Sequence, residues 1–469
     1  MIFYTAARKY QWETLLAASL VFYILSMGKL PVILIAVFFL TYAGAIILNI
    51  LREKGCPDKF LKFFRRGIIV SCVALLVLGR TAHLFSVLGN SYFTLKAIGY
   101  LIDSDRDPKK CERNFGRYLL YLIYFPTIVQ GPFNRYTQFR DCFKDVIRFD
   151  YTRLMHGLQR FLWGAFKKLI VAERLALFVN YVYGDLEQFN GLIIVMATCA
   201  YAIQLYADFS GYMDIMIGVS DSLGISIPEN FRQPYFSKSL AEFWRRWHIT
   251  LGHWFRDYVM FSFVMSSTGR KVGKWFKKIS KKAGKKAATV IGTAIVWFLI
   301  GLWHNLSVNY FAWGMYNCVI ICFSMMFEDH FSDMRRKLRV DGNGVGYQFF
   351  CVVRTICLVL ISDVLLIVHS FGDINLVAQK ILTDFWPKSG LDIAAVGWSF
   401  QDVKVLCIGI CIMFIVSVMK EKEISLLHKI DRMPLPLRWG VYYLLLFSVL
   451  IYGCYGGQYD ASQFIYMQF

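Results

Sequence analysis

His304 lies in a long apolar stretch, and its chemistry is the most suggestive in the chain. No aspartate, glutamate, lysine or arginine occurs between residues 287 and 327. An ionisable side chain in such surroundings is costly to keep in a bilayer, so its default interpretation is functional. An imidazole accepts a proton near neutral pH, which is what a general base requires. The alternative interpretation is a core histidine whose polar atoms are satisfied.

A second polar region, residues 242–258, contains His248. Helical spacing places Trp247, Leu251, Trp254 and Tyr258 on one face and Arg245, His248 and Arg256 toward another, which predicts an amphipathic helix, at least in its first turns. Aromatic residues favour the headgroup level, so this helix could lie in the interface as an anchor. The rival interpretation is a wall of an active-site cavity, where Arg245, Arg246 and Arg256 receive phosphate or carboxylate groups.

The third polar region is residues 206–214, within an apolar stretch. Asp208 and Asp214 need partners or water in such a place. Ser210 and Gly211 could break the helix there and free backbone groups, which are tolerated when they line a cavity. The alternative is that the two carboxylates pair with arginines and join helices.

The elements that position these residues are apolar helices. Of the 469 residues, 57% are hydrophobic and 18% are charged, which is typical of a polytopic membrane protein. The sequence predicts an all-α fold in the cell membrane, formed by one membrane domain over residues 1–469. The run 118–131 is short enough to be re-entrant. Candidate spans or paired spans are residues 12–26, 30–51, 67–89, 118–131, 154–183, 191–223, 254–267, 287–303, 308–327, 347–371, 403–419 and 439–455.

The net charge of +20 does not indicate nucleic-acid binding, because the basic residues bracket apolar segments. Residues 270–286 carry nine lysines and arginines, and short loops this basic remain cytoplasmic. The twelve cysteines lie mostly in apolar runs without CxxC pairs, so we interpret them as small hydrophobic residues and expect no metal site.

The last eleven residues, 459–469, form an aromatic tail that ends in Phe464, Tyr466 and Phe469. Aromatic side chains at the end of a membrane protein are commonly interfacial anchors.

These stretches together resemble the membrane-bound O-acyltransferase family, in particular the branch with alginate O-acetyltransferases and the teichoic acid D-alanyltransferase. The resemblance lies in the order and spacing of residues 124–132 (YFPTIVQGP), 208–212 (DFSGY), 230–235 (NFRQPY), 242–248 (EFWRRWH), 254–258 (WFRDY) and 301–304 (GLWH). It implies a ring of tilted transmembrane helices around a central tunnel. A cytoplasmic funnel would admit the acyl donor, and an outward funnel would admit the acceptor.

The resemblance also implies roles for single residues. His304 matches the presumed catalytic histidine, and His248 matches a histidine in the same tunnel. Residues 464–469 look like the F-x-Y-x-x-F ending of a small partner peptide in D-alanylation, so Tyr466 would carry the acyl group. Asn305 stands where glycine is expected, and Asn305 or His248 is the candidate donor to an oxyanion. The expected substrate-binding residues are Trp303, Asn305, Asp208, Ser210, Arg245, Arg246 and Arg256.

The sequence thus predicts a membrane O-acyltransferase that moves an acyl group, in our judgement acetyl, from a cytoplasmic thioester toward hydroxyls of a cell-surface or secreted polysaccharide. The donor would be acetyl-coenzyme A or an acyl carrier protein, with no bound cofactor. Membrane lipid and an extracytoplasmic esterase- or transferase-like protein are the expected partners. A D-alanyl transferase is the first alternative. A transporter or flippase is the second, although the inverted repeats typical of transporters are not visible in the sequence.

Overall fold

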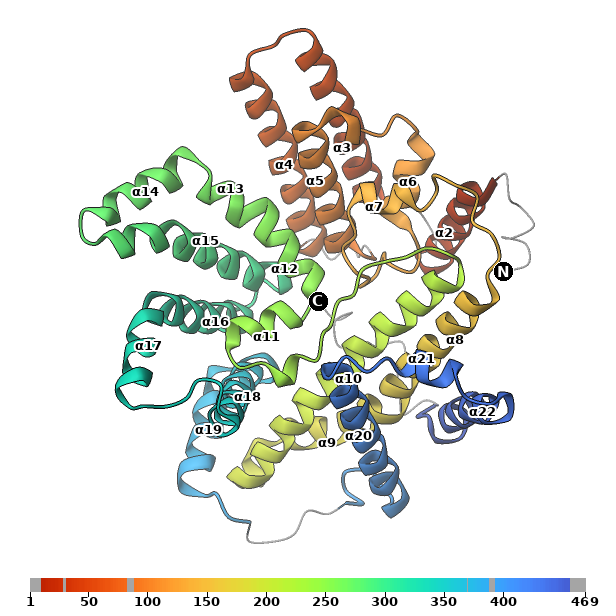
Figure 1. The fold of residues 1–469 in the computed structure, drawn as a ribbon, viewed down its shortest axis with the longest axis vertical. Coiled ribbons are helices and arrows are strands. Elements are labelled where there is room, and N and C mark those ends of the chain that lie inside the picture. The colour runs from red at the N-terminus through yellow and green to blue at the C-terminus, as the bar shows by residue number, and fades with distance from the viewer. Residues whose placement is uncertain (1–9, 28–30, 82–87, 369, 388–392, 456–469) are drawn as a thin grey trace. The chain divides into compact units, whose positions relative to one another are not determined.

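The computed structural model describes residues 10–27, 31–81, 88–368, 370–387 and 393–455, and within these ranges the regular elements are all helices. Figure 1 shows their order along the chain. The chain divides into two compact units, residues 1–161 with 213–229 and residues 162–212 with 230–469. The long helices α8 (Tyr151–Phe166) and α10 (Gly191–Ser222) each contribute residues to both units.

In the described part of the chain, seven helices are long and apolar enough to cross a bilayer. Their lengths of 18 to 32 residues match the roughly 20 residues that a hydrocarbon core requires. The predicted all-α, multi-pass membrane protein is confirmed. These helices are α3 (Val32–Glu53), α10, α15 (Lys281–His304), α16 (Val308–Met326), α18 (Val345–Ile367), α20 (Phe400–Glu421) and α22 (Leu435–Tyr452).

The first unit has a core of tyrosines that contact one another. Tyr118 packs against Tyr100 with ring centroids 4.3 Å apart, and its hydroxyl lies 2.7 Å from Thr41 Oγ1. Arg160 ties the two sequence segments of this unit together, because it forms ion pairs with Asp214 at 2.9 Å and Glu229 at 2.6 Å. Besides α3, its helices are α2 (Gln11–Met27), α4 (Asp58–Thr81), α5 (Asn90–Arg106), η3 (Pro108–Lys110), α6 (Phe115–Ile123) and α7 (Tyr136–Asp141).

The second unit contains His248 and His304 and the other five long apolar helices that follow α10. Its shorter elements connect or flank these helices. They are η4 (Lys167–Ala172), α9 (Glu173–Gly184), η5 (Leu186–Gln188), η6 (Pro234–Phe236), α11 (Leu240–Arg246), α12 (Ile249–Phe255), η7 (Arg256–Met260), α13 (Phe261–Val264), α14 (Ser267–Lys277), α17 (Glu328–Lys337), α19 (Phe371–Thr383) and α21 (Leu426–Asp431).

The amphipathic helix predicted over residues 242–258 is confirmed in its first turns, which belong to α11, but it does not continue as one helix. α11 ends at Arg246, Trp247 is extended, and His248 has the left-handed backbone angle φ 44°. Backbone hydrogen bonds hold this non-helical stretch against the segment before α11. The Arg232 amide donates to the Arg246 carbonyl at 2.9 Å, and the Ile249 amide donates to the Asn230 carbonyl at 3.0 Å. The spacing of residues within one helix cannot predict these hydrogen bonds, which place His248 between the two short helices α11 and α12.

The expected break at Ser210 and Gly211 is also wrong, since α10 continues through both residues. A Cβ atom at Gly211 would lie 2.9 Å from the Gly164 carbonyl oxygen, so this glycine permits close helix packing. Of the other short candidate spans, run 118–131 leaves helical structure after Ile123, and run 254–267 divides among α12, a π-helical turn and α13.

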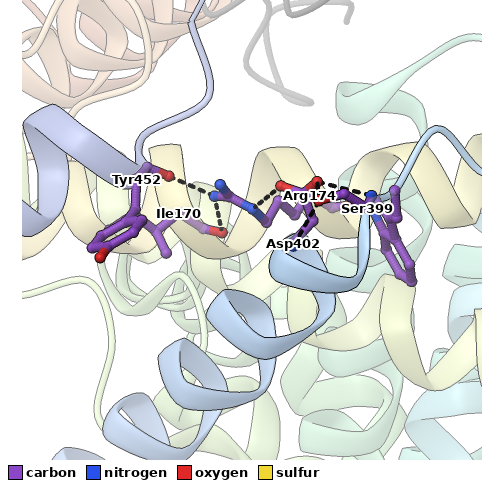
Figure 2. A network of polar contacts seen from close by, with 6 residues as sticks. Ile170, Arg174, Ser399, Asp402 and Tyr452 are labelled. Carbon is purple, nitrogen blue, oxygen red and sulfur yellow. Dashed lines mark hydrogen bonds and ion pairs between the residues drawn. The ribbon is translucent and has the colours of Figure 1, made fainter.

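The C-terminal helix is fastened to the π-helical turn η4 through Arg174 (Figure 2). Arg174 Nη1 donates to the carbonyl oxygens of Tyr452 at 2.7 Å and Ile170 at 3.1 Å, and Nε donates to Asp402 Oδ1 at 3.2 Å. Asp402 also accepts from the backbone and side chain of Ser399 at the start of α20. One buried guanidinium therefore fixes the end of α22 and the start of α20 against the same turn.

Helices α15 and α16 cross at two glycines. A Cβ at Gly301 would lie 2.9 Å from the Tyr310 carbonyl oxygen, and one at Gly314 would lie 2.9 Å from the Trp297 carbonyl oxygen. Small residues allow helix backbones to approach this closely. The crossing brings the first turns of α16 against the end of α15, where His304 lies.

We predict that Gly314→Ala lowers the melting temperature of the detergent-solubilised protein. The added methyl group meets backbone that must shift, which costs about 1–3 kcal/mol of unfolding free energy. The control is Gly440→Ala in α22, where nothing lies within 4 Å of the added atom and removal of a helical glycine stabilises by up to about 1 kcal/mol. Equal melting temperatures for the two variants would contradict the crossing.

Candidate active site

His304 is the last residue of α15 and is surrounded by aromatic rings. Its side chain is 7% exposed, and Asn305 caps the helix in an extended conformation. The imidazole centroid lies 4.9 Å from the ring of Trp303, 5.3 Å from that of Trp313 and 6.1 Å from that of Tyr310. The end of a transmembrane helix thus presents a buried imidazole in apolar surroundings, where an uncompensated positive charge is costly.

His248 is fixed by Asn230, which belongs to the motif NFRQPY but is not among the predicted site residues. Asn230 is fully buried, and its Oδ1 accepts from the amide of Thr250 at 3.0 Å and from the Thr250 hydroxyl at 2.9 Å. His248 Nδ1 lies 3.3 Å from the same oxygen. Because an amide oxygen can only accept, this contact assigns the proton to Nδ1 and leaves a lone pair on Nε2.

The two histidines meet at Trp303. The Trp303 ring lies 6.4 Å from that of His248 and 4.9 Å from that of His304. Burial lowers the pKa of His248 well below its usual 6.5, and the nearby His304 lowers it further. His248 lies outside the seven long apolar helices. It is therefore neutral at physiological pH and can accept a proton or a hydrogen bond through Nε2.

Asp208 and Ser210 contact lysines of the π-helical turn η4. Lys168 Nζ lies 2.6 Å from Asp208 Oδ1 and 2.7 Å from Glu173 Oε1, while Lys167 Nζ donates to Ser210 Oγ at 2.8 Å. Phe209 lies between these residues in the sequence, and its ring packs perpendicular to His248 at 4.9 Å. This buried network orients the stretch of α10 that contacts His248.

The three predicted arginines differ in their surroundings. Arg246 forms ion pairs with Glu242 and Glu421, both at 2.8 Å, and so joins α11 to the end of α20. Arg256 is exposed and pairs with the adjacent Asp257 at 3.0 Å. Arg245 is exposed as well. Tyr466, the remaining predicted site residue, lies outside the described residues.

Trp244, Trp297 and Trp313 form a cluster, here called the tryptophan cluster, beside His304. Trp244 packs perpendicular to Trp297 at 5.1 Å and Trp313 at 5.4 Å, and the latter two lie 5.8 Å apart. Of these residues, only Trp244 belongs to one of the motifs, EFWRRWH. Tryptophan in an apolar helix resembles ordinary core or interface sequence, so only the contact with His304 reveals the cluster.

The tryptophan cluster is linked to a polar network on three helices. Trp244 Nε1 donates to Asn317 Oδ1 at 2.9 Å, and Asn317 Nδ2 donates to Ser362 Oγ at 2.9 Å and to the Trp313 carbonyl at 2.9 Å. Asn317 and Ser362 are fully buried. In the described ranges, no group of three or more His, Cys, Asp or Glu residues is arranged to bind a metal ion.

The sequence of residues 112–362, more than half of the chain, matches the family model described as MBOAT, membrane-bound O-acyltransferase family. The chain therefore belongs to this family. The expected family resemblance is confirmed.

Curated relatives with similar sequences are named as acyl-transferring enzymes. The chain is 32% identical to a teichoic acid D-alanyltransferase of Bacillus subtilis over 52% of this chain and 60% of the relative. It is 32% identical to a probable alginate O-acetylase of Pseudomonas syringae over 50% of this chain and 42% of the relative. It is 30% identical to a peptidoglycan O-acetyltransferase of Helicobacter pylori over 50% of this chain and 46% of the relative. The matches thus span about half the length of these relatives.

We predict that His248 is neutral at about pH 6, with its proton on Nδ1, because burial disfavours the imidazolium ion and Asn230 accepts from that nitrogen. Nitrogen-15 NMR of protein labelled at histidine distinguishes the two tautomers and the charged ring. The resonance is assigned by its loss in His248→Gln. An imidazolium spectrum at this pH, or a proton on Nε2, would refute the assignment.

Proposed function

We propose that this protein is an O-acyltransferase that transfers an acyl group from a cytoplasmic thioester, through a tunnel within the membrane, toward a hydroxyl group of a cell-surface polysaccharide. The observation that carries the proposal is the pair of buried histidines in contact with Trp303. The family membership supports the same reaction class. In this proposal the helices form the ring around a central tunnel that the resemblance implies.

His304 is the general base. A phenol or sugar hydroxyl is a poor nucleophile at neutral pH, since the phenol pKa is about 10. His304 takes the hydroxyl proton as the oxygen attacks the thioester carbonyl, and a carbon–oxygen bond forms. The carbon–sulfur bond then breaks, and the thiolate leaves with the proton from the imidazolium. The product is an oxygen ester and a free thiol.

Apolar surroundings protect the thioester from hydrolysis. Trp303 is 9% exposed and lies beside both histidines, so it excludes water from the place where the thioester would bind. Asn305 borders the same end of α15. His248 is proposed to help shape the site through its contact with Trp303, because the single proton of the incoming hydroxyl goes to His304.

The predicted arginines and α10 residues receive different roles. Arg245 and Arg256 are exposed and are proposed to bind anionic groups of the donor. Arg246 already has two carboxylate partners, and Asp208 and Ser210 already have lysine partners. We therefore propose that these three residues position the site without contacting the substrate.

The alternating direction in which successive helices cross the membrane supports transfer toward the outer face. The lysine-rich residues 270–286 precede α15, so positive charge favours a cytoplasmic start and an outward end at His304. If α16, α18, α20 and α22 each cross once, Tyr452 at the end of α22 reaches the same outward face. The connection between α20 and α22 contains Lys422, Lys429 and Arg432, as this topology requires.

Tyr466 is proposed to carry the acyl group. Arg174 fixes the Tyr452 carbonyl, and the Cys454 amide donates to the Leu169 carbonyl at 3.0 Å, so the tail departs from a defined place on the second unit. Tyr466 follows Tyr455 by eleven residues. An extended segment of that length reaches at most about 40 Å, which is of the order of the bilayer thickness.

The acyl group is proposed to be acetyl, and the final acceptor a polysaccharide hydroxyl reached with the help of an extracytoplasmic esterase- or transferase-like protein. The donor is acetyl-coenzyme A or an acyl carrier protein. D-alanyl transfer remains the second candidate, because the teichoic acid D-alanyltransferase and the alginate O-acetylase are equally identical to this chain over the matched regions.

We predict that His304→Ala reduces the transfer of labelled acetyl from its thioester by at least about a hundredfold, because no base remains to take the hydroxyl proton. His304→Gln, which retains a polar side chain without basicity, should be equally inactive. Transfer is measured in membranes that contain equal amounts of folded protein. Wild-type rates in either variant would remove the catalytic role of His304.

We predict that Tyr466→Phe abolishes acylation of the polymer, since only the phenolic oxygen that would carry the acyl group is removed. Tyr459→Phe in the same tail is the matched control and should retain full acylation. The readout is ester-linked acyl groups on isolated envelope polysaccharide, and their mass distinguishes acetyl from D-alanyl. Unimpaired acylation in Tyr466→Phe would leave the tail as an interfacial anchor.

A further inference from the structure

Trp313 carries a buried N–H donor, and its ring lies beside the proposed catalytic base. Trp313 is 3% exposed, and its ring lies 5.3 Å from that of His304 at an interplanar angle of 88°. Its Nε1 is inaccessible and has no hydrogen-bond partner among the described residues. An indole nitrogen donates and does not accept, so this donor requires an acceptor from elsewhere to be satisfied.

The packing around Trp313 keeps this donor in place. Its ring contacts Trp244 at 5.4 Å and Trp297 at 5.8 Å in the tryptophan cluster, and Tyr310 at 6.5 Å. Its backbone carbonyl accepts from Asn317 Nδ2 at 2.9 Å. A close-packed interior restricts movement of so large a side chain, so the ring cannot readily turn to find another acceptor.

The neighbouring Trp244 differs in this respect. Its Nε1 donates to Asn317 Oδ1 at 2.9 Å, so the chain supplies an acceptor to one indole of the cluster and none to the indole nearer His304. Asn317 also binds Ser362, which fixes the orientation of the amide. Within the tryptophan cluster, the indole that contacts His304 therefore differs from Trp244, whose N–H already has an acceptor.

We infer that Trp313 Nε1–H donates a hydrogen bond to the carbonyl oxygen of the acyl group during transfer. This inference rests on the proposed function. As the hydroxyl oxygen attacks, the carbonyl oxygen acquires negative charge, and it returns to a carbonyl when the carbon–sulfur bond breaks. A fixed donor in a site without water stabilises this charge. The proton still moves to His304, since an indole N–H only donates a hydrogen bond.

The other candidate donors fit this role less well. His248 directs its Nδ1 proton to Asn230 Oδ1 and presents a lone pair on Nε2, which cannot stabilise an oxyanion. Asn305 lies beyond the end of α15 and is only partly buried, so water competes for its amide. Trp313 combines a buried N–H, a fixed ring and contact with the base.

The direct test replaces Trp313 with β-(3-benzothienyl)alanine, which has the shape of tryptophan but sulfur in place of the N–H group. We expect single-turnover acetyl transfer to Tyr466 to slow by about a hundredfold to a thousandfold, the usual effect of losing one oxyanion donor. The same replacement at Trp297 is the matched control, and it should leave the rate close to that of the wild-type protein, because that indole lies farther along α15 from His304. Wild-type rates for the Trp313 protein would overturn the inference.

A second measurement does not require turnover. In the His304→Ala background, acetyl-coenzyme A with a carbon-13 carbonyl reports hydrogen bonding through its infrared stretching frequency. We expect the frequency of the bound carbonyl to rise when benzothienylalanine replaces Trp313 and to stay unchanged when it replaces Trp297. An unchanged frequency at Trp313 would overturn the inference.

The proposed function and this inference fail in different ways. If the wild-type protein transfers no acetyl group, both are refuted. If the wild-type protein transfers acetyl, His304→Ala does not, and the Trp313 replacement transfers at the wild-type rate, then the proposed function stands and the role of Trp313 is refuted.

Discussion

The proposed site depends on one constraint, which is that an imidazole buried in apolar surroundings must be compensated by the groups around it. His304 is at the end of a transmembrane helix, where its ring contacts Trp303, Trp313 and Tyr310. His248 meets the same constraint through Asn230, which fixes one tautomer. Burial lowers the pKa of His248, so its ring is neutral at physiological pH.

Departures from regular helix create this arrangement. His248 takes a left-handed backbone conformation between α11 and α12, and pairing with the segment after α10 keeps it there. The π-helical turn η4 presents Lys167 and Lys168 to α10, which orients Phe209 toward His248. Irregular backbone and π-helical turns are frequent at functional sites, because they direct side chains that a continuous helix would place elsewhere.

The apolar helices could be predicted from the sequence, because hydrophobic runs are a local signal. His248 and His304 were singled out for a similar reason, since a histidine amid apolar residues is also a local signal, and their catalytic role stays a prediction. The sequence did not predict the break at His248, which depends on hydrogen bonds with residues 230 and 232. Ser210 and Gly211 predicted a helix break, yet Gly211 serves close packing against Gly164. Asn317 and Trp313 escaped notice since their significance arises from contacts among α11, α16 and α18, which no local pattern records.

The central claim is that the protein transfers an acyl group from one face of the membrane to the other by covalent chemistry. It is tested most directly in sealed proteoliposomes that receive labelled acetyl thioester only at the face with the lysine-rich residues 270–286. The account predicts that label appears at the opposite face as an oxygen ester, with the free thiol retained where the donor was added. Label that crosses as intact thioester, without ester formation, would contradict the account and identify a transporter.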